Sequence, residues 1–254
     1  MKVLLTGATG AAGLPILRTL LADPSVSSVT VLARRPLPTW AALSPTSPTT
    51  HPKLTTIPDT DFLHYSPQLR STIAAHDACI WALGKSSLGM SEAAYTEMTV
   101  GYLDAFFHAA QESGAGTPER PFRIVFISAY GADSSETSRV MYSRVKGIAE
   151  NRLLANARAS NGAIRATVMR PGYFFPAPAD APYQRSMWER IAAKPIGPVM
   201  SSMRPHMVIS TDEIAHFAIG AAKGLWDEKG DLFINDEMKR LVRETPDAPG
   251  ASQS

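Results

Sequence analysis

Two side chains that can exchange protons lie four residues apart in the second half of the chain. Tyr142 and Lys146 fall in the segment Arg139 to Ala159, whose pattern predicts a helix, so both side chains share one face. A tyrosine with an ordinary pKa of about 10 is a poor acid or base near neutrality, and a neighbouring ammonium group lowers that pKa. The hydroxyl of Ser128, which precedes this helix, can bind a substrate carbonyl or alcohol. Together the three residues predict proton transfer paired with hydride transfer at a nicotinamide.

A glycine-rich turn near the start of the chain suits the cofactor that such chemistry needs. Gly7, Gly10 and Gly13 follow a short apolar run that predicts a buried strand, and they precede a helical pattern. Pro15 allows regular helix to begin no earlier than about Ala12. Glycines let the backbone turn tightly and approach a diphosphate, whose charge the free N–H groups of the helix start stabilise. The alternative is a strand-to-helix turn that holds no ligand.

The second predicted strand, Ser28 to Ala33, bears on which dinucleotide binds. It ends directly in Arg34 and Arg35, and no aspartate or glutamate occurs between Pro24 and Ile57. A carboxylate at this place holds the ribose hydroxyls of NAD, whereas an arginine holds the 2′-phosphate of NADP. We therefore predict NADP as the cofactor, with NAD as the second choice. Two solvated arginines at a loop edge are the alternative interpretation.

Strands and helices alternate through the first two thirds of the chain. Strands are predicted at Val3 to Leu5, Ser28 to Ala33, Lys53 to Ile57, Asp77 to Leu83, Phe122 to Ser128 and Ala163 to Arg170. Helices are predicted at about Ala12 to Ala22, Ser66 to Ala75, Ser91 to Ser113 and Arg139 to Ala159. This alternation specifies an α/β fold with a doubly wound parallel sheet, covered on both faces. Leu83 and Gly84 end one of these strands, where the backbone can pass close to a nucleotide, and they join the predicted cofactor site.

The chain becomes less regular after Pro171 and Gly172. Residues 173–203 carry many aromatic and methionine side chains between prolines, near the edge where open α/β sheets bind ligands. This region lines an apolar substrate pocket or packs over the sheet edge in the ordinary way. Short strands at Met207 to Ser210 and Leu232 to Ile234 and a helix at Asp212 to Lys223 follow. We predict one domain over residues 1–243, with 173–210 as a small C-terminal extension on the substrate side and 244–254 as a disordered tail.

Composition excludes several classes of protein. The 25 basic and 23 acidic residues leave a net charge of +2, which gives no indication of a nucleic-acid partner. Glycines interrupt the N-terminal apolar run, which argues against an export signal, and no stretch approaches the roughly 20 apolar residues of a membrane helix. The single cysteine, Cys79, lies in an apolar run and is predicted to be a buried thiol. We expect a cytoplasmic protein that acts on a small molecule and contacts neither nucleic acid nor a membrane. The histidines lack the spacing of metal ligands, so no metal site is predicted.

Several motifs together resemble the short-chain dehydrogenase/reductase superfamily. They are GATGAAG at Gly7 to Gly13, Ser128 followed by Gly131-Ala132-Asp133, the run from Tyr142 to Gly147 with Glu150, and Arg170-Pro171-Gly172. More narrowly, they are similar to its atypical and extended members, which include the NmrA-like, Tat-interacting-protein-like and NAD-dependent epimerase/dehydratase groups. The resemblance covers residues 1–172 well and residues 207–222 weakly.

The resemblance implies a Rossmann fold and a role for each motif. Tyr142 is then the catalytic acid or base, Lys146 binds the nicotinamide ribose and lowers the tyrosine pKa, and Ser128 orients the substrate. Arg34, with Arg35 beside it, meets the 2′-phosphate. The other predicted cofactor contacts lie at the diphosphate, at the strand end that faces the nucleotide and at the carboxamide. They are Gly7, Thr9, Gly10, Ala12, Gly13, Leu83, Gly84, Pro171 and Gly172.

Two departures from the superfamily pattern leave alternatives open. Many relatives have a second serine where this chain has Ala129, so the serine role belongs to Ser128 or else to Ser134 or Ser135. The usual asparagine is also missing, and Thr99 stands near its place.

The main hypothesis is an NADP-dependent oxidoreductase that acts on a small carbonyl, alcohol or activated alkene. The alternatives are a non-catalytic NADP(H)-sensing regulator and, less favoured, a nucleotide-sugar epimerase or dehydratase with Arg204 at a substrate phosphate. The two long predicted helices, Ser91 to Ser113 and Arg139 to Ala159, also offer surfaces on which a homodimer could form.

Overall fold

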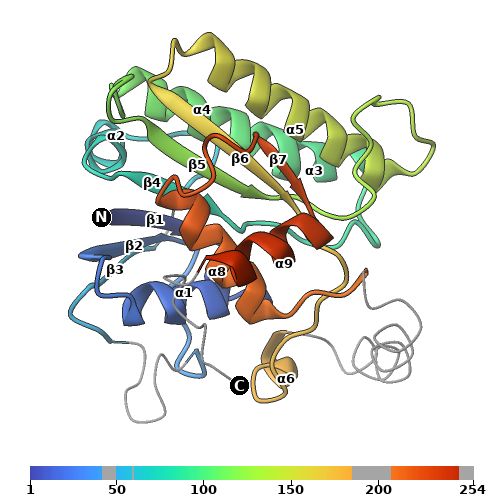
Figure 1. Ribbon diagram of the computed structural model, residues 1–254, viewed down its shortest axis with the longest axis horizontal. Coiled ribbons are helices and arrows are strands. Elements are labelled where there is room, and N and C mark those ends of the chain that lie inside the picture. The colour runs from blue at the N-terminus through green and yellow to red at the C-terminus, as the bar shows by residue number, and fades with distance from the viewer. Residues whose placement is uncertain (42–49, 59, 185–206, 246–254) are drawn as a thin grey trace.

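The computed structural model describes residues 1–41, 50–58, 60–184 and 207–245, and within them it contains one parallel β-sheet. Its seven strands lie in the order β3-β2-β1-β4-β5-β6-β7 (Figure 1). The strands are β1 Lys2–Thr6, β2 Ser28–Leu32, β3 Leu54–Ile57, β4 Ala78–Trp81, β5 Phe122–Ile127, β6 Ile164–Arg170 and β7 Leu232–Ile234. All neighbouring pairs are parallel, so the predicted doubly wound parallel sheet, a Rossmann-like α/β fold, is confirmed.

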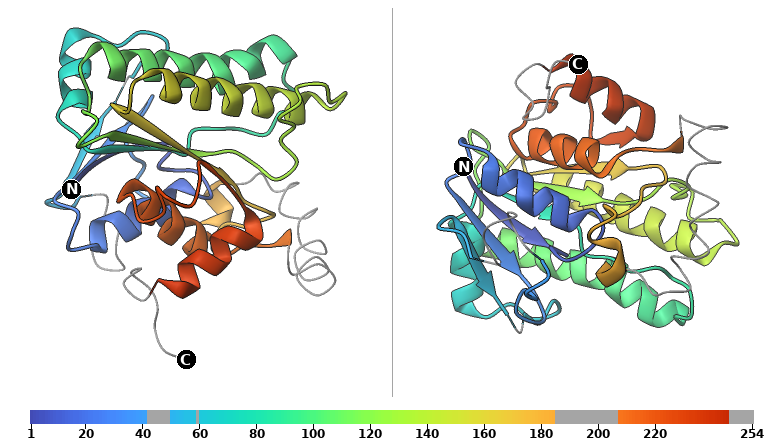
Figure 2. Two further views of the ribbon diagram at one scale, coloured as in Figure 1. Left: turned by 45° about the horizontal axis from the view of Figure 1, so that its top comes forward. Right: turned by 90° about the horizontal axis from the view of Figure 1, so that it is seen from below.

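Helices cover both faces of the sheet (Figure 2). On one face lie α1 Gly13–Ala22, α8 Thr211–Ala222 and α9 Asn235–Glu244. On the other lie α2 Pro67–Ala74, α3 Glu92–Thr96, the π-helix η1 Glu97–Gly101, α4 Tyr102–Glu112 and α5 Met141–Ala159. The short α6 Ala181–Gln184 lies apart from both layers. Among the described residues, no helix combines the length and apolar character that crossing a membrane requires.

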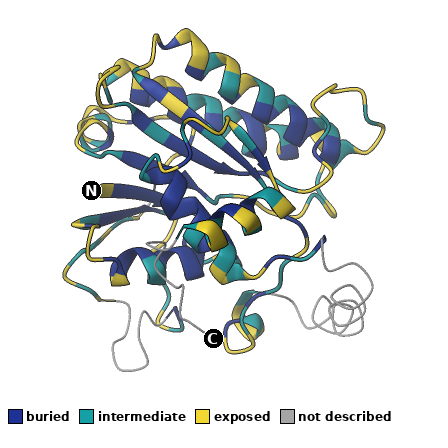
Figure 3. Cartoon of the chain, in the orientation of Figure 1, coloured by how far each residue is buried: buried dark blue, intermediate teal, exposed yellow. Residues whose placement is uncertain are grey.

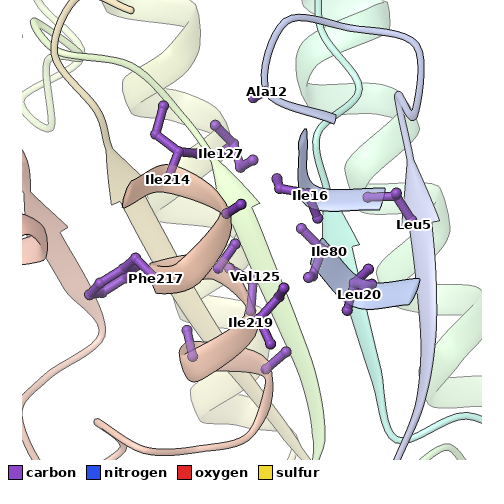
Figure 4. Close-up of a cluster of buried hydrophobic side chains, with 14 of the residues drawn as sticks. Leu5, Ala12, Ile16, Leu20, Ile80, Val125, Ile127, Ile214, Phe217 and Ile219 are labelled. Atoms are coloured by element: carbon purple, nitrogen blue, oxygen red, sulfur yellow. The ribbon is translucent and has the colours of Figure 1, made fainter. Parts of the chain in front are cut away.

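The two faces of the sheet bury separate apolar clusters, because side chains alternate along each strand. Leu5, Ile80 and Val125 pack toward α1 and α8 (Figure 4), whereas Leu4 and Trp81 pack toward α4 and α5. At the centre of the sheet, β4 is buried throughout and β1 is buried except at Lys2, whereas most exposed residues lie on helix surfaces and in loops (Figure 3). Cys79 lies in this buried layer as a free thiol, whose pKa burial raises. Truncation of a large core side chain such as Trp81 to alanine lowers the free energy of unfolding by roughly 2–5 kcal/mol.

The register of the strands places the candidate site residues at one edge. Thr6 at the end of β1 is level with Leu32 in β2 and with Trp81 in β4, and Trp81 is level with Phe126 in β5. The chain therefore leaves these strands on the same side. The strand order reverses between β1 and β4, and in open α/β sheets ligands bind at such a switch point.

The structure corrects the sequence-based prediction after β6. Met207 to Ser210 is not a strand, because it makes only an isolated bridge between Tyr173 and Val208. Residues 235–244 form the helix α9, which was not predicted, with Met238 and Leu241 buried. α9 ends at Glu244, the residue from which the tail is predicted, and residues 246–254 lie outside the described part of the chain.

Two of the predicted helices differ from the helices in the structure. The segment Ser91 to Ser113 is helical, but η1 interrupts it with a π-turn, a feature found frequently at functional sites. The helix predicted from Arg139 begins at Met141, and α6 was not predicted at all.

Candidate functional site

The glycine turn between β1 and α1 is compact because two of its residues lack a Cβ atom. Gly7 has φ +67°, and a Cβ there would lie 2.3 Å from the carbonyl oxygen of Ala82 after β4. A Cβ on Gly13 would lie 2.0 Å from the carbonyl oxygen of Gly7. Real side chains do not tolerate such distances, so the turn can approach β4 and close on itself only with glycine at both positions. This geometry fits a backbone cradle for a diphosphate.

The residues at the start of α1 suit an anion. Its N-cap residue is Ala12, which supplies no side-chain cap, and the first turn carries no acidic residue. The positive end of the helix dipole is therefore not compensated by its own first turn. Thr9 and Gly10 are accessible at this point, whereas Ala12 and Gly13 are buried and contribute through packing.

The strand ends on either side of the turn contain the other predicted nucleotide contacts. Arg34 and Arg35 are exposed just after β2, and neither pairs with a side chain in the described ranges. The Leu83 N–H donates to the buried hydroxyl of Thr6 at 3.2 Å, which ties the end of β4 to the end of β1. Gly84 is exposed and would have open space around a Cβ. The structure thus brings these residues to one edge, and their roles stay predictions.

Tyr142 lies in the first turn of α5 and is half-buried. Its hydroxyl donates a hydrogen bond to the backbone carbonyl of Tyr130. Burial raises the pKa of Tyr142 above its ordinary value, two nearby tyrosines and Glu150 act in the same direction, and Arg170 acts against them. Lys146 is not among the groups that change this pKa in the structure, so the lowering of the tyrosine pKa by Lys146 stays a prediction.

Lys146 is buried one helical turn further along α5. Its ammonium group lies 4.9 Å from the centre of the Phe126 ring and 3.5 Å from the carbonyl oxygen of Ile127. Burial lowers the pKa of Lys146 to about 8, and the negative charge of Glu150 partly offsets this effect. A lysine with this pKa can gain or lose a proton close to physiological pH.

Ser128 belongs to a polar chain that the sequence did not reveal. Its hydroxyl donates to a carboxylate oxygen of Glu150, a residue of α5 with no exposed surface. The guanidinium of Arg170, at the end of β6, binds both carboxylate oxygens, with Nε 3.1 Å from each. Nη2 of the same arginine donates to the hydroxyl of Ser134 at 2.6 Å. The proton of the Ser128 hydroxyl is therefore directed at Glu150, and the substrate-orienting role of Ser128 stays a prediction.

The other candidates for the serine and asparagine roles have local partners. Ser135 and Thr137 bond to the carboxylate of Asp133, whose pKa these contacts lower, so Ser135 stabilises its own turn. Thr99 is buried within η1, and its hydroxyl bonds to that of Tyr95. The structure places Thr99 at the helical irregularity, and within the described residues the Lys146 ammonium group donates to the carbonyl of Ile127 and not to Thr99.

Pro171 and Gly172 are buried after β6. The Pro171 carbonyl accepts from the Tyr130 N–H, and the Gly172 N–H donates to the side chain of Asn235 at 2.8 Å. These bonds fix the backbone where the carboxamide contact was predicted.

Sequence reasoning gave no role to Glu150, Arg170 or the segment around α6. Glu150 could have been noticed, because it stands four residues after Lys146 on the same helix face, where a charged residue needs a partner. The amide of Gln184 in α6 donates to the carbonyls of Thr9 and Gly10, at 3.1 Å each, and so caps the glycine turn.

Part of the predicted substrate region cannot be placed. Met187, Trp188, Met200, Met203 and Arg204 lie outside the described residues. The described residues hold no group of three or more histidine, cysteine or acidic side chains suited to a metal ion.

Solved structures share this fold. A short-chain type dehydrogenase/reductase from Mycobacterium ulcerans superposes with a TM-score of 0.67 at 15% identity, covering 94% of this chain and 90% of that one. The Bordetella bronchiseptica enzyme WbmF in complex with NAD+ gives a TM-score of 0.59 at 14% identity, covering 87% and 69% of the two chains. The resemblance to short-chain dehydrogenases/reductases is thus confirmed for the fold.

Sequence comparison gives nearer relatives. No model of a known protein family matches the chain. "Protein fmp52, mitochondrial" of Emericella nidulans is 29% identical over 238 residues, which span 93% of this chain and 92% of that protein. Its namesake in Aspergillus fumigatus is 30% identical over 234 residues, 91% and 90% of the two lengths. These names contradict the expected cytoplasmic location, which composition alone could not decide. Identity at this level, sustained along nearly the whole length, shows that the chain belongs to the fmp52 family.

Proposed function

We propose that the protein is an NADP-dependent oxidoreductase that transfers a hydride to or from a small carbonyl compound, alcohol or activated alkene. One observation supports this proposal above the others. The glycine turn and the Tyr142 and Lys146 face of α5 lie at the same edge of the sheet, around the switch point between β1 and β4. A dinucleotide held by the turn would run across this edge toward the two proton-exchanging residues.

The residues at the glycine turn fit such a cofactor. The spaces that a Cβ on Gly7 or Gly13 would fill are closed by backbone, so no side chain at these two positions keeps a ligand from the backbone of the turn. Arg34 and Arg35, exposed at the end of β2, offer two positive charges to a 2′-phosphate and favour NADP over NAD.

The bound cofactor would supply or accept the hydride. Tyr142 would exchange its bond to the Tyr130 carbonyl for one to the substrate oxygen, and would donate or accept the proton there. Lys146 would bind the nicotinamide ribose, and its positive charge would lower the pKa of Tyr142 once both contact the cofactor. Burial keeps water away from the Lys146 ammonium group, which strengthens its electrostatic effect.

Tyr142→Phe tests the mechanism. NADPH and NADH are titrated separately against the wild-type protein and the variant, and hydride transfer is then measured with a panel of aldehydes, ketones and enones. We expect binding to prefer NADPH, the affinity of the variant to stay within about twofold, and turnover to fall by at least about 100-fold. Unchanged turnover in Tyr142→Phe would refute the assigned role.

A second candidate function is a non-catalytic sensor of NADP(H). Its support is that the Tyr142 hydroxyl is already bonded to a backbone carbonyl and has a raised pKa, a poor starting point for proton transfer. In that case NADPH binds, and the substrate panel gives no hydride transfer above background. Turnover at an ordinary enzymatic rate, about 1 s⁻¹ or more, rules against this function as the main one.

We also propose a mitochondrial location, by analogy with the printed names of the fungal relatives. Fractionation of cells that express the chain with a C-terminal tag tests it. Recovery of the protein with the cytosolic fraction alone would count against the analogy.

A further inference from the structure

The peptide unit between Tyr130 and Gly131 lies against the Tyr142 hydroxyl. Its carbonyl oxygen, which belongs to Tyr130, accepts the hydrogen bond from that hydroxyl. A Cβ on Gly131 would lie 3.1 Å from the same phenol oxygen, a tight distance for a real side chain. The absence of a side chain at position 131 therefore leaves room for the phenol against this peptide.

This peptide unit is the centre of a β-turn. The Ala132 N–H donates to the Ala129 carbonyl at 3.2 Å, which closes a turn over residues 129–132. Gly131, the third residue of the turn, has φ +81°, whereas Tyr130, the second, does not have a positive φ. A positive φ at the third residue alone is the mark of a type II turn, in which glycine is favoured at that position.

A type II turn becomes a type I turn when its central peptide rotates by about 180°. The φ of the third residue then changes from about +80° to about −90°, and glycine adopts both values readily. The bonds that hold the surrounding backbone do not use the atoms of this peptide. The Tyr130 N–H donates to the Pro171 carbonyl at 2.8 Å, and the Asp133 N–H donates to the Ser143 carbonyl at 2.9 Å. The ends of the turn can therefore stay in place while the peptide rotates.

Rotation would reverse what the peptide offers to Tyr142. The carbonyl and the N–H of a trans peptide point in opposite directions, so the Gly131 N–H now points away from the phenol. This N–H has no hydrogen-bond partner among the described residues, and Gly131 is exposed. Rotation therefore breaks only the bond from Tyr142. It puts a group that can only donate hydrogen bonds where a group that can only accept them had been.

Resting on the proposed function, we propose that Gly131 is a positioning residue and that the Tyr130–Gly131 peptide is a switch for Tyr142. In the orientation that the structure shows, the carbonyl takes up the phenol proton. After rotation, the Gly131 N–H donates to a lone pair of the phenol oxygen, and the phenol proton is free for the oxygen of a carbonyl substrate. Once that proton has moved, the same N–H stabilises the phenolate, which takes the proton of an alcohol in the reverse reaction. One orientation of the peptide thus serves both directions.

Gly131→Ala and Gly131→Asn form the test, because both add a Cβ but differ in backbone preference. Alanine disfavours a positive φ and so favours the rotated peptide, whereas asparagine tolerates a positive φ. Ionisation of Tyr142 is followed by tyrosinate absorbance, as the difference between each protein and the same protein with Tyr142→Phe. We expect the midpoint to fall by about one pH unit or more in Gly131→Ala and by less than half as much in Gly131→Asn. A midpoint equal to that of wild type in Gly131→Ala, or equal shifts in both variants, overturns the proposal.

Gly114→Ala is the matched control for backbone strain. Gly114 has φ +70° at the end of α4, and a Cβ there would meet nothing within 4 Å. The Tyr142 midpoint is expected not to move in this variant, and a shift as large as that of Gly131→Ala overturns the proposal. The other groups that act on the ionisation of Tyr142 are unchanged in all these variants; they are Tyr95, Glu150, Arg170 and Tyr173.

The pH profile of kcat/KM for alcohol oxidation separates positioning from structural support. The limb that reports the phenolate is expected to move to lower pH in Gly131→Ala, by the same amount as the absorbance midpoint. Structural damage alone lowers the plateau and leaves the limb in place, and that result overturns the proposal. A wild-type protein that transfers no hydride would refute the proposed function and not this inference, because the absorbance titration needs no turnover.

A measurement on the wild-type protein decides if Gly131→Ala does not fold. Crystals cross-linked with glutaraldehyde are studied at neutral pH and above the midpoint at which Tyr142 ionises. A phenolate has no proton to donate, so we expect Gly131 to change from a positive to a negative φ and its N–H to face the phenolate. A Tyr130 carbonyl that still faces the phenolate overturns the proposal.

Discussion

The two halves of the candidate site are built in different ways. In the cofactor half, residues 7–13, the geometry is set by backbone: a Cβ at Gly13 would lie 2.0 Å from a carbonyl oxygen. In the catalytic half, the positions of Ser128, Tyr142 and Lys146 depend on hydrogen bonds and on buried charge. Steric exclusion allows one residue type and one shape. A hydrogen bond such as that from Tyr142 to a carbonyl can be exchanged for another, so the catalytic half is the one that can respond to a ligand.

The largest expected effect comes from breaking the cofactor half. Gly13→Ala forces a methyl group into the carbonyl of Gly7, and the turn must open to admit it. We expect a loss of about 3 kcal/mol in the free energy of unfolding and loss of measurable NADPH binding. Urea unfolding and fluorescence titration with NADPH measure the two effects.

Gly84→Ala is the matched control, because a Cβ there meets nothing within 4 Å and the residue lies at the same edge of the sheet. Its unfolding free energy is expected to stay within about 0.5 kcal/mol of wild type. If Gly13→Ala behaved like Gly84→Ala, the cofactor half would not be sterically determined.

The next effect, in the catalytic half, is a dependence of stability on pH. Lys146 has a pKa of about 8 in the folded protein and an ordinary value of 10.5. Between these values the unfolded chain binds the extra proton, so stability rises as pH rises through this window, and the penalty is complete below pH 8. Lys146→Met removes the titration and keeps an unbranched apolar side chain.

The free energy of unfolding of wild type and of Lys146→Met is measured with urea at pH 8 and pH 10. The difference between the two proteins is expected to shift by about 2 kcal/mol in favour of wild type at the higher pH. Taking the difference cancels the tyrosines that titrate in the same range. A difference that stays flat with pH would mean that the Lys146 amine is solvated and that burial does not tune the catalytic half.

Much of the fold could be predicted because its strands are buried on both faces. Continuous apolar runs such as Ala78–Trp81 identify a central parallel strand from residue type alone. α9 was missed although Met238 and Leu241 have helical spacing, because its many charges resemble those of a solvated loop. The bridge at Val208 depends on contact with Tyr173, which no local pattern encodes.

The two halves of the site also differ in how much of each could be predicted from the sequence. The glycine turn could be predicted because a missing side chain is visible in the sequence. The partner of the Ser128 hydroxyl could not, because Glu150 lies 22 residues away and meets it only when α5 packs on β5. The rise of the Tyr142 pKa could not be predicted for a similar reason, since burial, its largest cause, is a property of the fold.

A smaller effect concerns Arg34, a predicted cofactor contact that lies outside residues 7–13 and would act through its side chain. Arg34→Ala is expected to weaken NADPH binding about tenfold, or 1.4 kcal/mol, and to leave NADH binding unchanged. Arg240→Ala, a change at another exposed arginine, is the control and should alter neither affinity. Equal losses for both dinucleotides would show that Arg34 does not distinguish the 2′-phosphate.

The smallest effect measures how firmly the catalytic half is held before a ligand arrives. Tyr142→Phe removes the hydrogen bond from the Tyr142 hydroxyl to the Tyr130 carbonyl. An ordinary hydrogen bond contributes about 1 kcal/mol to the free energy of unfolding, so we expect a loss of that size. Tyr183→Phe, at a tyrosine with 59% of its surface exposed, is the control and should cost less than about 0.5 kcal/mol. If Tyr142→Phe proved as neutral as the control, the hydroxyl would cost almost nothing to redirect toward a substrate. A loss well above 1 kcal/mol would instead mean that Tyr142 is locked onto the carbonyl, which favours the sensor over the enzyme.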